Sequence, residues 1–76
     1  MKSNTATEEI RLELLQASKK FGAFSSPHEG LAVILEEYEE LKAEVFKKSE
    51  ERDIEKLHKE AKHVAAMGLR FMVDLT

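Results

Sequence analysis

The stretch LAVILEEYEELKAEV, residues 31–45, decides the fold. It contains no glycine or proline, and its apolar side chains recur every three or four residues rather than every second residue. This spacing predicts a helix with one apolar stripe, which we expect to face the rest of the chain. The stripe consists of Leu31, Ile34, Leu35, Tyr38, Leu41 and Val45.

A clear start signal lies just before this stretch. Ser26 can cap the first turn, Pro27 suits the first helical position, and Glu29 can reach back from the third position. No helix breaker follows before Lys47-Lys48-Ser49. We therefore predict a helix over about residues 27–47, roughly 30 Å long.

Two further helices are predicted, one on each side of this helix. The earlier one has a capping signal at Thr5 or Thr7 and a stop at Gly22, which gives a helix over about residues 5–20. The later one begins near Asp53, another capping residue, and runs to about residue 74. The stripe of the earlier helix consists of Ile10, Leu14, Ala17 and Phe21.

These signals together predict an all-α chain with a single domain over residues 1–76. A short turn near residue 50 joins the second and third helices, so we expect them to form a long antiparallel hairpin. Between the first two helices, Phe21 and Phe24 are predicted to plug the end of the bundle. The alternative is that one of them stacks on a planar ligand.

The third helix is the main sequence evidence for self-association. From Ala61 onward its apolar residues spread around most of the circumference, and a helix that is apolar on several sides must be covered on several sides. A chain of this length buries only ~60% of its unfolded surface, and it has no cysteine to form a disulfide. We therefore predict a subunit interface on the third helix, in a homo-oligomer that is a dimer or a tetramer.

Composition excludes several classes of function. The chain has 12 basic and 15 acidic residues, a net charge of −3, which disfavours binding to nucleic acid because such binding depends on neutralising phosphates. No uncharged segment is long enough to span a bilayer. The N-terminus also lacks the apolar segment of a secretory signal. We expect a cytoplasmic protein that binds neither nucleic acid nor membrane.

The second predicted helix carries an unusual density of acid, because five of the nine residues from Glu36 to Glu44 are glutamate. Such runs usually form a solvated helix face. At about 100° per residue, however, Glu37, Glu40 and Glu44 fall on one face, while Glu36 points to the outer side. The run therefore contains a distinct acidic face.

The hairpin brings this acidic face to a second one. In an antiparallel pair with its turn near residue 50, residues whose numbers add to about 100 lie at the same height. Glu40 is then level with Glu60, and Glu37 is level with His63. Crowded carboxylates favour a cation, and Mg²⁺ prefers oxygen ligands. We predict a metal site formed by Glu37, Glu40, Glu60 and His63, although His63 alone would ordinarily be a structural histidine.

The acidic motif resembles that of a known family. Glu36-Glu37-x-x-Glu40, followed one helix later by Glu60, is similar to the signature of the MazG-like all-α nucleoside triphosphate pyrophosphohydrolases, in which Glu-Glu-x-x-Glu precedes Glu-x-x-Asp. The resemblance spans roughly Phe21 to Leu75. The flanking segments that support it are Ser26-Pro27-His28-Glu29-Gly30 and Val64-Ala65-Ala66-Met67-Gly68-Leu69-Arg70-Phe71.

The resemblance implies a function and roles for the acidic residues. It implies a metal-dependent hydrolase that converts a (d)NTP and water into a (d)NMP and pyrophosphate, as a dimer or tetramer. Glu37, Glu40 and Glu60 would bind Mg²⁺, and Glu36 would lie close by or activate water, so that Glu36 and Glu37 are the expected catalytic residues. Arg70 and Lys47 are the nearby basic candidates for phosphate contact, although we interpret them more readily as surface residues.

One difference from the family motif opens alternatives. His63 stands where the family has aspartate, and a neutral nitrogen ligand should weaken Mg²⁺ and favour Mn²⁺ or Zn²⁺. A non-catalytic metal- or nucleotide-binding helical oligomer derived from that family is therefore the second hypothesis. Two others are a di-iron bundle, in which Glu-x-x-His is the repeated unit, and a plain helical interaction module.

Overall fold

A computed structural model of the protein describes all residues, 1–76, and it is all-helical, as predicted. Helix α1 spans Ser3–Phe21, α2 spans Pro27–Val45, and α3 spans Ile54–Leu75. A single 3₁₀ turn, η1 at Ser49–Glu51, lies between α2 and α3. None of the helices combines the length and the apolar character needed to cross a bilayer.

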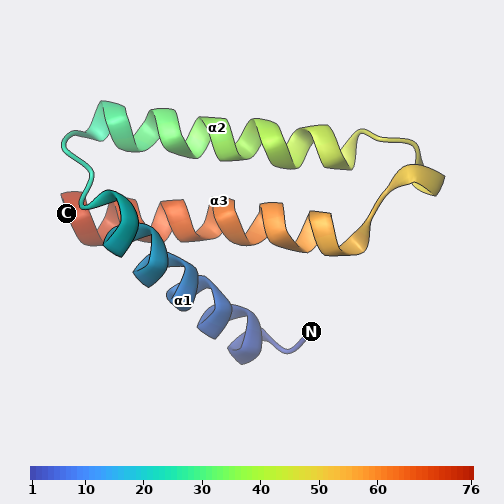
Figure 1. Ribbon diagram of the computed structural model, residues 1–76, viewed down its shortest axis with the longest axis horizontal. Coiled ribbons are helices and arrows are strands. Elements are labelled where there is room, and N and C mark those ends of the chain that lie inside the picture. Colours follow the sequence, from blue (N-terminus) through green and yellow to red (C-terminus); the bar gives the residue numbers. More distant parts are fainter.

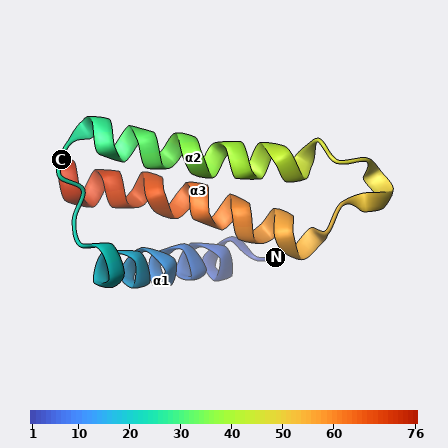
Figure 2. The same ribbon diagram turned by 45° about the horizontal axis from the view of Figure 1, so that its top comes forward.

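Helix α3 is the central element of the fold. Figure 1 shows α2 and α3 running antiparallel and side by side, with α1 crossing α3 obliquely, and Figure 2 shows the same order from a second direction. Both α1 and α2 pack closely on α3, but no Cα atom of α1 lies within 8 Å of a Cα atom of α2. The radius of gyration is 13.1 Å, against roughly 11 Å for a compact chain of this length. The arrangement is therefore open, and its core is thin.

The starts of α2 and α3 follow from local sequence. The Ser26 hydroxyl accepts a hydrogen bond from the Glu29 N–H at 3.1 Å, and the Glu29 carboxylate accepts one from the Ser25 N–H at 2.9 Å. Asp53 accepts from the N–H of Glu55 at 2.9 Å. Each cap satisfies backbone donors that have no partner within the helix. Both predicted start sites are confirmed.

Helix α1 begins two residues before the predicted start, and it ends within one residue of the predicted end. Its N-cap residue is Lys2, which makes no side-chain cap. The predicted capping box does not form: Thr7 donates to the Ser3 carbonyl at 2.7 Å, and Glu8 pairs with Arg11. At the other end, Gly22 has φ 75° and its N–H donates to Ser18 O at 2.9 Å. That φ favours glycine, which explains why α1 ends there.

The core lies where the α1–α2 connection crosses α3. Phe24 is only 5% exposed and plugs this end of the bundle as predicted, whereas Phe21 is 67% exposed and does not. Phe21 is the last residue of α1, and the chain turns away at Gly22 before packing Phe24 inward. The buried apolar residues are Leu14, Ala17, Phe24, Ala66 and Met67.

The orientation of α2 differs from the prediction. Leu31 and Leu35, from the predicted buried stripe, are 62% and 54% exposed. The side of α2 that faces α3 begins instead at Gly30, where an added Cβ would lie 2.6 Å from Cδ2 of Phe71. Glycine therefore allows close approach along this face, and α2 is rotated so that Glu37 faces α3 and much of the apolar stripe faces outward.

Candidate metal centre

Four side chains from the two helices of the hairpin converge on one point. Helix α2 contributes Glu37 and Glu40, and α3 contributes Glu60 and His63. One ligand atom from each of the four lies within 4.8 Å of the others. The antiparallel register explains this convergence, because η1 lies at the middle of the connection and keeps Glu37 level with His63. The structure thus brings together the four residues that the sequence singled out.

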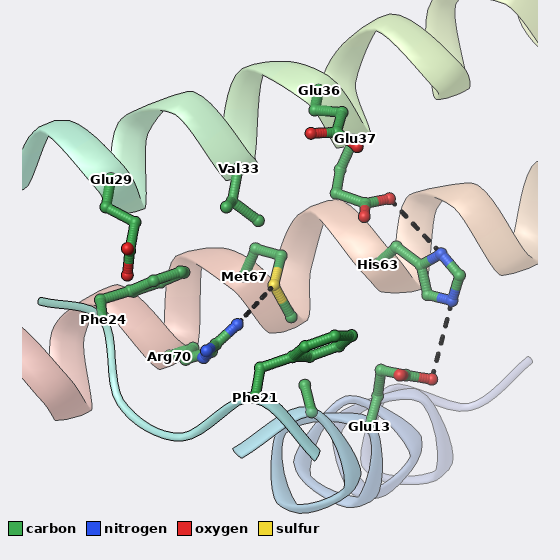
Figure 3. A pocket seen from close by; sticks show the side chains of 11 residues that line it. Glu13, Phe21, Phe24, Glu29, Val33, Glu36, Glu37, His63, Met67 and Arg70 are labelled. Carbon is green, nitrogen blue, oxygen red and sulfur yellow. Dashed lines mark hydrogen bonds and ion pairs between the residues drawn. The ribbon is translucent and has the colours of Figure 1, made fainter. Parts of the chain in front are cut away.

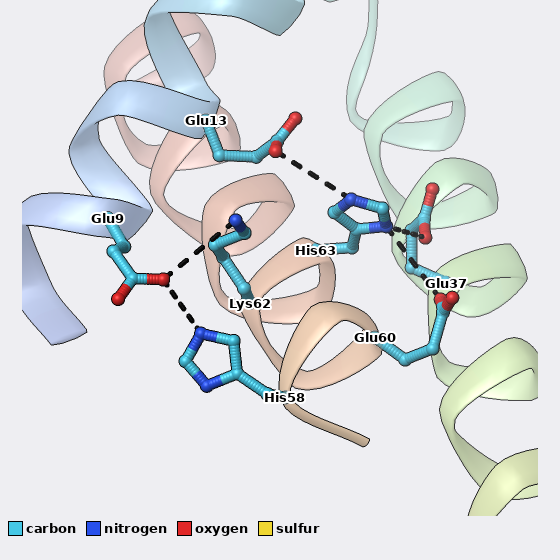
Figure 4. A network of polar contacts seen from close by, with 7 residues as sticks. All are labelled: Glu9, Glu13, Glu37, His58, Glu60, Lys62 and His63. Carbon is cyan, nitrogen blue, oxygen red and sulfur yellow. Dashed lines mark hydrogen bonds and ion pairs between the residues drawn. The ribbon is translucent and has the colours of Figure 1, made fainter. Parts of the chain in front are cut away.

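His63 lies close to two of the three carboxylates of this cluster, as Figure 4 shows. Its Nδ1 atom lies 3.5 Å from Oε2 of Glu37 and 3.7 Å from Oε2 of Glu60. These are ion-pair distances rather than hydrogen-bond distances. Both Oε2 atoms are buried, and neither has a hydrogen-bond donor. A buried carboxylate oxygen without a donor is costly, and a cation bound between the two would offset that cost.

The electrostatics of the cluster also favour a bound cation. Burial raises the pKa of the Glu37 carboxyl above its ordinary value, and the nearby carboxylates of Glu40 and Glu60 raise it further. His63 partly opposes this effect on the Glu37 pKa. The metal-free cluster is therefore short of positive charge. Three carboxylates and one imidazole fit a divalent cation, and the nitrogen ligand favours Mn²⁺ or Zn²⁺ relative to an all-oxygen site.

A cavity of about 500 Å³ opens next to the cluster and shares Glu37 and His63 with it. It lies between α1 and α2, over α3, because the backbones of the two outer helices are separated by more than 8 Å between Cα atoms. Figure 3 shows Phe24 at the opposite end from His63, with Phe21 between them. A volume of this order is typical of small-molecule sites. An aromatic end and a metal-ligand end suit a ligand that is part planar and part anionic.

Of the remaining predicted site residues, Glu36 and Lys47 lie outside the cluster. Glu36 is exposed on the wall of the cavity, one position from Glu37. Lys47 lies beyond the C-terminal end of α2, where its Nζ is 2.8 Å from Oε2 of Glu44. Lys47 does not line the cavity. The structure therefore gives it no position from which to contact a ligand there.

The interpretation of Arg70 as a surface residue is wrong, because it is only 4% exposed. Its guanidinium donates to the Gly22 carbonyl at 2.6 Å and lies 4.0 Å from the centre of the Phe24 ring. Its Nε is 3.6 Å from Oδ2 of Asp74, which also accepts the Phe24 N–H at 2.9 Å. Arg70 therefore fastens the α1–α2 connection to the end of α3, at the wall of the cavity.

Sequence reasoning missed one polar residue beside the cluster. Glu13 of α1 directs its Oε1 toward Nε2 of His63, at 3.7 Å. The available signal was weak: Glu13 directly precedes Leu14, a residue of the buried stripe, so its side chain borders the surface that packs on α3. The height of α1 along α3 depends on the α1–α2 connection, which residue spacing alone does not determine.

Comparison of the chain with protein-family models, with curated proteins and with solved structures finds no match.

Proposed function

We propose that the chain binds a divalent cation through Glu37, Glu40, Glu60 and His63, and that it hydrolyses a nucleoside triphosphate to the monophosphate and pyrophosphate. One observation carries this proposal: four metal-ligand side chains converge beside a cavity, and two buried carboxylate oxygens among them lack hydrogen-bond donors. The resemblance of the acidic motif to MazG-like enzymes supplies the reaction.

In this proposal the residues around the cavity have different roles in the reaction. A divalent cation, when bound, would clamp the phosphate oxygens and offset charge that develops on the leaving group. Glu36, which is exposed on the cavity wall, would accept a proton from the attacking water. Phe21, which is exposed and lines the cavity, offers aromatic surface for the base. Arg70 holds the buried Phe24 in place at the end of the cavity rather than contacting phosphate.

The test is pyrophosphate release from each common ribo- and deoxyribonucleoside triphosphate, with Mg²⁺ and with Mn²⁺. We expect release from at least one substrate, and loss of that release in Glu40→Gln and Glu60→Gln. Glu39→Gln is the matched control, because Glu39 is an exposed residue of the same helix that lies outside the cluster. If no substrate yields more pyrophosphate than the Glu60→Gln background, the enzymatic proposal is wrong.

We also propose that the functional unit is a homo-oligomer, with a second copy of the chain covering α2. Leu31, Leu35 and Tyr38 recur at helical spacing and are 62%, 54% and 49% exposed. An exposed apolar patch of this kind is typical of an association surface. We favour this location over the interface expected on α3, because Ala66 and Met67 of α3 are already buried within the chain, whereas Met72 and Val73 near its end remain exposed.

A second candidate function is a metal- or nucleotide-binding oligomer without catalysis. The composition of the cavity favours it, because the lining includes four glutamates and a single basic residue, Arg70, whose guanidinium is already bonded. The cavity thus offers no free cation of its own to the phosphates. Calorimetry that detects binding of Mn²⁺ or of a nucleotide, under conditions without pyrophosphate release, would favour this candidate.

A further inference from the structure

The imidazole of His63 is held between carboxylates on two opposite sides. Its Nδ1 faces Glu37 and Glu60, while its Nε2 lies 3.7 Å from Oε1 of Glu13. Figure 4 shows the ring between α1 on one side and α2 on the other. The side chains of His63 and Glu13 are only 24% and 23% exposed. Three helices therefore determine where the two ring nitrogens point.

The two nitrogens cannot play the same part at a metal centre. A neutral imidazole has one N–H donor and one nitrogen lone pair, and a metal takes the lone pair. Histidines that bind metals usually donate the other N–H to a carboxylate or carbonyl, which fixes the tautomer and the orientation of the ring. A cation bound in the cluster would take the lone pair of Nδ1, which faces Glu37 and Glu60, and the proton would then be on Nε2, which faces Glu13.

We propose that Glu13 is a positioning residue of the metal centre: when a cation binds, Glu13 closes the present 3.7 Å gap, accepts the Nε2–H of His63 and thereby presents Nδ1 to the cation. This inference rests on the proposed metal site and extends it from two helices to three. It gives α1 a role beyond packing. The helix docks on α3 through Leu14 and Ala17, which are buried, and so carries Glu13 to His63.

A simpler role for Glu13 must be distinguished from this one. In the alternative, Glu13 is an ordinary ion-pair partner of His63, with Glu37 at a similar distance on the other side of the ring. The two roles differ once the metal is bound. A positioning residue changes metal affinity and the tautomer of His63, whereas an ion-pair partner changes only the docking of α1.

The chain offers a matched control for the docking of α1. Glu9, one helical turn before Glu13, pairs with His58 of α3 at 2.7 Å and lies 3.9 Å from Lys62. It joins the same two helices without touching the cluster. Glu9→Ala and Glu13→Ala therefore each remove a glutamate that links α1 to α3, but only Glu13→Ala removes the partner of His63.

The experiment measures the Mn²⁺ dissociation constant of the full chain and the ¹⁵N chemical shifts of His63 in the Zn²⁺-loaded protein. We expect Glu13→Ala to weaken Mn²⁺ binding by about 10- to 100-fold, the usual effect of removing such a partner. Glu13→Gln keeps an acceptor oxygen, so its Mn²⁺ affinity should lie between that of the native chain and that of Glu13→Ala. Glu9→Ala should leave the Mn²⁺ affinity unchanged. In the native chain Nδ1 should be metal-bound and Nε2 should carry the proton.

The results of this experiment distinguish the role of Glu13 from the existence of the metal site. Metal bound through Nε2, or no bond between His63 and the metal, overturns the role of Glu13 while the carboxylate site stands. Equal affinity in Glu13→Ala and Glu9→Ala also overturns it. Absence of metal binding in the native chain overturns both proposals. If Glu13→Ala does not fold, the spectrum of the native protein alone decides.

Discussion

At the scale of one residue, Glu37 shows that the acidic cluster destabilises the folded protein when no metal is bound. Its carboxyl has a raised pKa, first because it is buried and then because Glu40 is near. A carboxyl whose pKa is higher in the folded than in the unfolded chain binds more protons when folded. The free energy of unfolding therefore decreases as the pH rises from 4.5, the ordinary value, through the raised pKa.

This sign leads to a prediction for Glu37→Gln. We expect the metal-free variant to be more stable than the native chain at neutral pH, with a smaller loss of stability between acidic and neutral pH. It should also lose the stabilisation that Mn²⁺ gives the native chain, because a bound ligand stabilises only a protein that binds it. Thermal melts with EDTA and with Mn²⁺ at several pH values measure both effects. A variant that is less stable at neutral pH would contradict the prediction, and Glu39→Gln is the control.

Arg70 is a second residue whose surroundings allow a prediction. Removing one partner of a buried ion pair typically costs about 3–5 kcal/mol, because the other charge is left uncompensated. Arg70→Ala leaves the carboxylate of Asp74, which is 9% exposed, without its cation and also frees the Gly22 carbonyl. We expect urea denaturation to show a loss of about 3 kcal/mol or more. A loss below about 1 kcal/mol, the size of a surface pair, would mean that Arg70 is not an anchor.

At the scale of the elements, features that depend on residues close together in the chain could be predicted from the sequence. Features that depend on packing between helices could not. The caps at Ser26 and Asp53 involve neighbours within three residues, so the sequence predicted them correctly. The register of the hairpin needed only the position of the turn. The rotation of α2 could not be predicted, because it depends on how closely two helices approach, and apolar spacing alone does not contain that information.

Gly30 is the residue that permits this approach, and it can be tested against Gly68. An alanine Cβ at Gly30 would lie 2.6 Å from Cδ2 of Phe71, whereas one at Gly68 would meet nothing within 4 Å. Alanine favours a helix by about 1 kcal/mol relative to glycine, and overpacking costs about 1–3 kcal/mol. We therefore expect Gly68→Ala to raise the melting temperature and Gly30→Ala to lower it. A stabilising Gly30→Ala would show that Phe71 moves aside freely.

At the scale of the whole molecule, the thin core and the outward apolar face of α2 have one cause. Only seven of 76 residues are buried, and no large side chain is fully buried. The inner face of α2 is partly occupied by Glu37, so it cannot also bury the apolar stripe against α3. The same rotation that assembles the acidic cluster thus leaves Leu31, Leu35 and Tyr38 uncovered.

This trade-off predicts a dimer that depends on α2. Burying a leucine stabilises by about 1.5–3 kcal/mol, so replacing Leu31 and Leu35 together with glutamate should dissociate the assembly. Analytical ultracentrifugation should then show a monomer, and the melting temperature should no longer rise with protein concentration, as it does when association stabilises a fold. Val73→Glu is the matched control on α3, since Val73 is also exposed, at 61%. A native chain that is monomeric at high concentration would contradict the prediction, and dissociation by Val73→Glu alone would return the interface to α3.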